Sequence, residues 1–126
     1  MDAYEAALAV VRERHPDARA AFLGGSVLTD HRTSTSDLDI VIVLHGPPAP
    51  YRESLRHADW PVEIFVHTEE SWHDFVEREV RRHRSPLLHM CGNGALLFDT
   101  DGVGERLAAD ARKRLSTGPP PATPDE

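Results

Sequence analysis

The sequence of 126 residues contains a single cysteine, Cys91. One cysteine excludes an internal disulfide and a cysteine-rich zinc site, and it favours a reducing interior as the compartment. No apolar stretch approaches the length of about 20 residues that a bilayer-spanning helix needs. The N-terminus, Met1–Glu5, is acidic and unlike a signal peptide. These absences predict a soluble, cytoplasmic protein without a membrane partner.

A surplus of positive charge is also missing. The 14 Lys and Arg residues are outnumbered by 21 Asp and Glu residues, which leaves a formal net charge of -7. Nonspecific binding to a nucleic-acid backbone depends on a basic surface, so we do not expect it. A nucleotide remains a compatible ligand, because a bound metal ion can reverse the local field.

The length fits one domain with a modest core. Apolar spacing predicts a mixture of helices and strands over residues 1–116, with helices at 2–14, 68–83, 87–90 and 103–115 and strands at 19–23, 38–44, 61–67 and 95–98. Thr68 is the expected N-cap of the second helix, and the unbroken apolar run of residues 40–44 predicts a central strand that is covered on both faces. Residues 51–59 are compatible with a short helix or an extended segment. Residues 117–126 are rich in Ser, Thr, Gly and Pro and are predicted to form a disordered tail or linker.

Two of the predicted helices carry a clear apolar stripe. In the first helix the stripe consists of Tyr4, Ala7, Leu8 and Val11, and in the second of Trp72, Phe75, Val76 and Val80. We assign Trp72 and Phe75 to the core rather than to a base-stacking surface. Cys91 is interpreted as a packed thiol, because no general base lies at a recognisable spacing from it.

The chemistry concentrates in residues 22–44. A turn at Gly24, Gly25 and Ser26 precedes a predicted helical turn and a polar loop, and Asp37 and Asp39 then open an apolar strand. Glycine lets the backbone approach a phosphate closely, and the amides that follow can bind an anion. We therefore interpret Gly25 and Ser26 as a phosphate-binding turn.

Asp37 and Asp39 project from one face of the strand, about 6.6 Å apart along the chain. Two carboxylates so close repel each other unless a cation joins them, and Mg²⁺ suits a triphosphate ligand. Glu63 lies in a later strand between apolar neighbours. If the two strands pair, Glu63 shares the face of the aspartates, and the three acids can hold two metal ions. The alternative is that Glu63 faces solvent.

These residues together resemble the signature of the DNA polymerase β-like nucleotidyltransferase superfamily. That signature is Gly-Ser, about ten residues, Asp-x-Asp in an apolar strand, and a third acid on a later strand. Here it corresponds to Gly25, Ser26, Asp37, Asp39 and Glu63. The spacing also resembles that of the minimal nucleotidyltransferases, which include bacterial antitoxin subunits.

The resemblance implies a small mixed β-sheet with helices packed mainly on one face. It further implies transfer of a nucleoside monophosphate from an NTP, with ATP as the expected donor and Mg²⁺ as the cofactor, to an acceptor hydroxyl on a small molecule, a protein or an RNA end. Many minimal members carry an arginine shortly after Gly-Ser. Here Val27 and Leu28 follow Ser26, and the nearest arginine is Arg32.

Two other functions are compatible with the sequence. The small size fits an antitoxin or interaction subunit that binds or adenylylates a helical ribonuclease toxin. The Pro-rich residues 117–126 fit a linker to a helical substrate-binding domain.

Overall fold

The computed structural model describes residues 2–24, 37–82 and 86–117. Along the chain these residues form the elements α1 (Ala3–Arg14), β1 (Ala20–Leu23), β2 (Leu38–Val43), β3 (Tyr51–His57), β4 (Trp60–His67), α2 (Glu69–Arg81), α3 (Pro86–Gly92), β5 (Ala95–Asp99) and α4 (Val103–Thr117). The predicted phosphate-binding turn, the polar loop after it and the tail beyond Thr117 lie outside the described residues.

The strands form one five-stranded sheet in the order β3-β4-β2-β1-β5. β2 runs parallel to β4, whereas the other three pairings are antiparallel. The mixed sheet expected from the resemblance is therefore confirmed. Residues 51–59, which the sequence left ambiguous, are mainly extended and add the edge strand β3.

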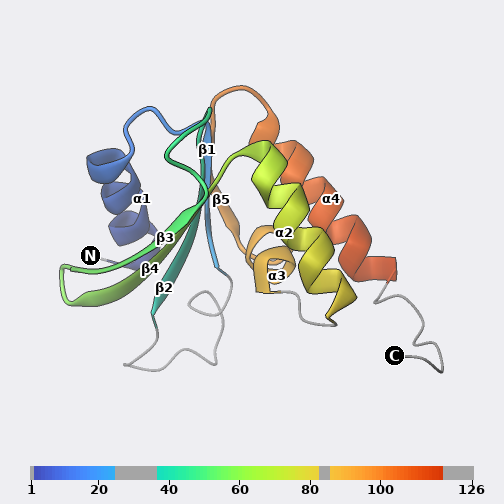
Figure 1. Ribbon diagram of the computed structural model, residues 1–126. Helices are drawn as coiled ribbons and strands as arrows, with labels where there is room; N and C mark the ends of the chain where they lie inside the picture. Colours follow the sequence, from blue (N-terminus) through green and yellow to red (C-terminus); the bar gives the residue numbers. More distant parts are fainter. Residues whose placement is uncertain (1, 25–36, 83–85, 118–126) are drawn as a thin grey trace.

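Helices cover both faces of the sheet, but unequally (Figure 1). α1 packs on one face with Ile40 and Ile42 of β2, and α2, α3 and α4 pack on the other face with Val41 and Val43. Both faces of β2 are covered, which explains why its sequence is apolar at successive positions. Within β2, Asp39 is the residue that remains partly exposed.

The predicted stripe of α1 was wrong in part. The buried residues of this helix are Ala3, Ala6, Ala7, Val10 and Val11, whereas Tyr4 is 43% exposed. The alanines are small, so the helix axis can approach the sheet closely along them. Tyr4 lies at the margin of that contact, where its hydroxyl donates to the carbonyl of Leu97 at 3.4 Å.

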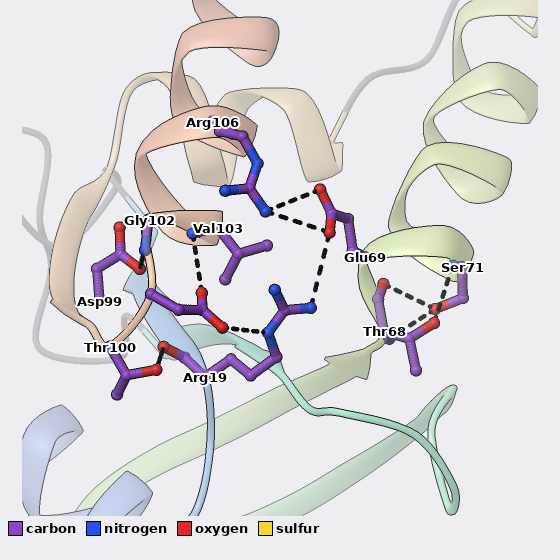
Figure 2. Close-up of polar contacts among 10 residues, drawn as sticks. Arg19, Thr68, Glu69, Ser71, Asp99, Thr100, Gly102, Val103 and Arg106 are labelled. Carbon is purple, nitrogen blue, oxygen red and sulfur yellow. Dashed lines mark hydrogen bonds and ion pairs between the residues drawn. The ribbon is translucent and has the colours of Figure 1, made fainter.

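α2 begins as the sequence predicts. Thr68 is its N-cap and forms a capping box with Ser71 (Figure 2). Trp72 and Val76 are buried, but Phe75 is 37% exposed, so its assignment to the core was wrong. α3 continues to Gly92, two residues past the predicted end, because the helix places apolar Cys91 in the core.

A polar network ties the first strand to the helices on one side of the sheet (Figure 2). Arg19 pairs with Asp101 at 2.8 Å and with Glu69 at 3.6 Å, and Arg106 reaches the same Glu69 carboxylate at 3.3 Å. Asp101 also accepts the Val103 N–H that opens α4. The network fixes the starts of α2 and α4 next to β1.

Among the described helices, none combines the length and apolar composition that a bilayer-spanning helix requires.

Candidate active site

Asp39 and Glu63 lie directly opposite each other on neighbouring strands. The parallel pairing of β2 with β4 places Asp39 against Glu63 and Val41 against Phe65. Both acids point to the face that α2, α3 and α4 cover, because Ile40 and Ile64 on the alternate positions belong to the α1 side. Asp37 precedes β2 and is exposed. The strand pairing on which the three-acid arrangement depends is therefore present.

The surroundings of Asp39 disfavour its charged form. Burial raises the pKa of the Asp39 carboxyl, and the negative charges of Asp37 and then Glu63 raise it further, against a smaller opposite effect of Arg52. A carboxylate held in this way gains stability from a cation placed beside it. The arrangement is unfavourable for the protein alone and suited to a positively charged ligand.

Glu63 has partners of its own on β3. Its carboxylate accepts the Ser54 hydroxyl at 2.9 Å and the Arg52 Nε–H at 3.0 Å. These two hydrogen bonds, with Ser54 first, hold the pKa of Glu63 below its usual value. Glu63 is thus half-buried and hydrogen-bonded to two side chains of β3, rather than facing solvent without a partner.

Sequence reasoning missed Arg52 and Ser54. Both lie in the segment that was left ambiguous, and both sit on the same face of β3 as their partner on β4. The sequence from Tyr51 to His57 has no apolar face that marks a strand, and its alternation of exposed and half-buried residues is seen only in the structure. The contact of Arg52 and Ser54 with Glu63 depends on the register of β3 against β4, which is set by tertiary structure.

Gly24 brings the end of β1 against Asp39. The Gly24 N–H donates to the Asp39 carbonyl at 2.7 Å. A Cβ at Gly24 would lie 3.1 Å from the Asp39 Cβ and 3.4 Å from the Met90 Cγ, so a larger side chain would disturb both. Gly25 and Ser26, which follow directly, lie outside the described residues.

The donor set partly fits Mg²⁺. In the part of the chain that the structure describes, no group of three His, Cys, Asp or Glu side chains is disposed to hold a metal ion. Glu63 is instead turned to Arg52 and Ser54. Asp37 and Asp39 supply the one or two carboxylates with which proteins commonly hold Mg²⁺, the remaining ligands being water and phosphate oxygens. The aspartate pair therefore fits the ion, and Glu63 can join after releasing Arg52.

A cavity of about 350 Å³ lies next to Arg52, the hydrogen-bond partner of Glu63. Arg52 and Phe65 line it from the sheet, with the Arg52 guanidinium 4.8 Å from the centre of the Phe65 ring. Phe75 of α2 and Leu87 and Met90 of α3 line it from the helices.

Two further groups near the site are inert as acids or nucleophiles at neutral pH. Burial lowers the pKa of His67 to about 4, so its ring is neutral, and its Nδ1 lies 2.9 Å from the Ser71 hydroxyl. Burial also raises the pKa of the Cys91 thiol to about 12, and the Trp72 indole N–H points to its sulfur at 3.3 Å. The interpretation of Cys91 as a packed thiol agrees with this environment.

Comparison with known families gives the class of protein. The model of the nucleotidyltransferase domain family matches residues 5–84, which include β1, β2 and β4 with all three acids. The match covers more than half of the chain, so the protein belongs to the nucleotidyltransferase domain family. The predicted superfamily is confirmed.

A solved structure supports the same fold. The chain is similar to a nucleotidyltransferase-like protein from Exiguobacterium sibiricum, with a TM-score of 0.63 and 14% sequence identity. The similarity covers 86% of this chain and 38% of the other, so this chain corresponds to well under half of that protein. Among curated proteins, none matches. These comparisons support nucleotidyl transfer in general and give no support to the antitoxin alternative.

Proposed function

We propose that this protein transfers a nucleoside monophosphate from an NTP, with ATP as the donor, to an acceptor hydroxyl. The observation that carries the proposal is the position of Asp39, which lies between Gly24 at the end of β1 and Glu63 on β4. The end of β1, which directly precedes the predicted phosphate-binding turn, and two carboxylate-bearing strands thus converge in a member of the nucleotidyltransferase domain family.

Asp37 and Asp39 would hold Mg²⁺, and Glu63 would complete the set for one or two ions. When bound, the metal neutralises phosphate charge and polarises the phosphoryl group. Gly25 and Ser26 would contact the triphosphate through backbone amides and the hydroxyl. Arg52 is a cation in place beside the acids, and it can pair with a phosphate oxygen once Glu63 turns away.

The reaction balances without any redox partner. The acceptor oxygen forms a bond to the α-phosphorus, the bond from that phosphorus to the bridging oxygen breaks, and pyrophosphate leaves with the electron pair. The hydroxyl proton is released to solvent. Hydrogen bonds to Ser54 and Arg52 lower the pKa of Glu63, which makes it a better ligand or hydrogen-bond acceptor for the hydroxyl than a proton-abstracting base.

Incubation with each α-phosphate-labelled NTP and Mg²⁺, alone and with cell extract, tests the proposal. We expect label to move to an acceptor with release of pyrophosphate, fastest with ATP, and to stop when EDTA removes the metal. No transfer from any NTP in the presence of extract would contradict it. The cytoplasmic location expected from the sequence belongs to the same proposal and supplies both ATP and Mg²⁺.

A further inference from the structure

The cavity next to Arg52 is lined by four elements and is mainly apolar. Its volume of about 350 Å³ lies between the β3–β4 pair and helices α2 and α3. Phe65, Phe75, Leu87 and Met90 form most of its apolar wall. This volume is at the lower end of the range of about 300–1,000 Å³ found for small-molecule sites, and apolar walls with a few polar groups are typical of them.

The polar groups at the cavity are already engaged. Glu79 accepts the Leu87 N–H at 3.0 Å, and His67 contacts Ser71. Arg52 lies on the Phe65 ring and donates to Glu63. Arg52 therefore contacts both the cavity and Glu63. A ligand that contacts Arg52 in the cavity lies close to Glu63.

Met90 of α3 links the wall of the cavity to the surroundings of Asp39. Met90 lines the cavity, and Met90 and Asp39 both lie within 3.4 Å of the position of a Cβ on Gly24. The strand residues that line the cavity come from β3 and β4, together with Pro50 just before β3. In the order β3-β4-β2-β1-β5, the strands β3 and β4 lie on the opposite side of β2, and therefore of Asp39, from β1 and Gly24.

This order separates two sides of the reaction. In an in-line displacement, the attacking oxygen and the leaving group lie on opposite sides of the phosphorus. In the proposed function the triphosphate is bound next to Gly24, which contacts Asp39 from the β1 side, so pyrophosphate departs on that side. The attacking hydroxyl must then approach from the β4 side, where the cavity is.

We propose that the cavity between β3–β4 and α2–α3 is the acceptor site, and that it takes a small molecule whose hydroxyl is carried on a flat, apolar ring. The inference rests on the proposed function. The ring packs between Phe65 and Phe75, and the hydroxyl points past Arg52 to Glu63. Its oxygen forms the new bond to the α-phosphorus, its proton goes to solvent, and pyrophosphate leaves toward Gly24.

Binding can be tested without turnover by using p-cresol as the probe. In two-dimensional amide NMR spectra of the full chain, p-cresol should shift the signals of Phe65, Phe75, Leu87 and Met90. Saturating Mg²⁺ with a non-hydrolysable ATP analogue should leave its dissociation constant within about twofold. Glucose, a polar polyol, should not shift these signals, and adenosine should not displace p-cresol.

Phe75→Ala and Tyr4→Ala form a matched pair of variants. Both residues are exposed aromatics on helices, but Phe75 lines the cavity and Tyr4 belongs to α1 on the opposite face. We expect Phe75→Ala to weaken p-cresol binding roughly five- to tenfold and Tyr4→Ala to leave it unchanged. Circular dichroism and thermal unfolding of each variant establish that both fold.

Displacement of p-cresol by adenosine or by the ATP analogue would overturn the inference, because the cavity would then hold the donor base. Equal effects of the two variants, or no shift of the cavity signals, would overturn it as well. The two proposals fail differently. A protein that transfers nucleotide but binds the donor base in the cavity contradicts only the acceptor site, whereas p-cresol binding without any transfer contradicts the proposed function and the acceptor role with it.

Discussion

Asp39 of β2 faces Glu63 of β4 across a parallel strand pair. Burial and the two neighbouring negative charges raise the pKa of Asp39. The folded protein thus destabilises the charged form of Asp39 relative to an exposed aspartate. Such an arrangement disfavours folding at neutral pH, and it is consistent with the proposal that the site binds a cation.

The first prediction follows from that cost. In metal-free buffer at pH 7, we expect Asp39→Asn to unfold at the same or a higher urea concentration than the wild type, because it removes repulsion from Asp37 and Glu63. The matched control is Asp99→Asn. Burial acts to raise the pKa of Asp99, but backbone N–H groups, that of Glu105 foremost, lower it overall.

The Asp99→Asn variant should therefore lose about 1 kcal/mol of unfolding free energy. A loss of stability in Asp39→Asn as large as that in Asp99→Asn would contradict the view that Asp39 is held at a cost.

The second prediction concerns Arg52, whose side chain is 65% exposed. Exposed ion pairs contribute little, so Arg52→Ala should change the unfolding free energy by about 0.5 kcal/mol or less. It should nevertheless raise the pKa of the Glu63 carboxyl toward its usual value, as measured by NMR titration of that carboxyl carbon. Arg56→Ala is the control, since Arg56 lies on the same face of β3 but donates to the Asp59 carbonyl. Equal pKa changes in the two variants would be inconsistent with the Arg52–Glu63 contact.

The third prediction is a pH dependence of stability. His67 is 6% exposed and its pKa is lowered to about 4, whereas in the unfolded chain it titrates near 6.5. Stability is therefore full above pH 6.5 and is lost as the pH falls toward 4, because the unfolded state binds the proton first. Between pH 8 and pH 5, His67 should remove about 2 kcal/mol from the unfolding free energy.

Urea denaturation of the wild type and of His67→Gln at both pH values measures this effect. The variant should lose less stability between pH 8 and pH 5 than the wild type, by about 2 kcal/mol. Identical losses in the two proteins would show that the folded-state pKa of His67 is not lowered.

The fourth prediction concerns the packing beneath the site. A Cβ at Gly94 would lie 2.2 Å from the carbonyl oxygens of both Leu23 and Met90. Those atoms belong to backbone and cannot move aside, so Gly94→Ala should lower the unfolding free energy by about 3 kcal/mol. Nothing lies within 4 Å of a Cβ at Gly46, and Gly46→Ala should stay within about 0.5 kcal/mol of the wild type. Thermal unfolding compares the two, and equal midpoints would refute the close approach at Gly94.

Local patterns predicted much of the fold. The apolar run of β2 identified a central strand, and Thr68 identified the start of α2, because both signals depend on neighbouring residues alone. The family and its mixed sheet were correctly inferred from the resemblance that Gly25, Ser26, Asp37, Asp39 and Glu63 carry. The roles of these residues, and of Gly25 and Ser26, remain predictions.

Other features depend on tertiary structure and were missed. The polar alternation of β3 has no apolar face that marks a strand, and its register with β4 decides that Arg52 and Ser54 reach Glu63. Periodicity placed Phe75 in the apolar stripe of α2. The Phe75 ring borders a cavity instead of the core because of where α3 packs, which periodicity within α2 does not reveal.

Pyrophosphate release directly measures whether the protein transfers nucleotide at a site that contains Asp39. The measurement compares the wild type, Asp39→Asn and the control Asp59→Asn with ATP, Mg²⁺ and cell extract. Asp59 lies in the β3–β4 turn with a positive φ of 70°, which asparagine also adopts, and it is exposed. We expect the wild type and Asp59→Asn to release pyrophosphate, and Asp39→Asn to release it at a rate at least about 100-fold lower. Equal rates in all three proteins would contradict the assignment of Asp39 to the active site.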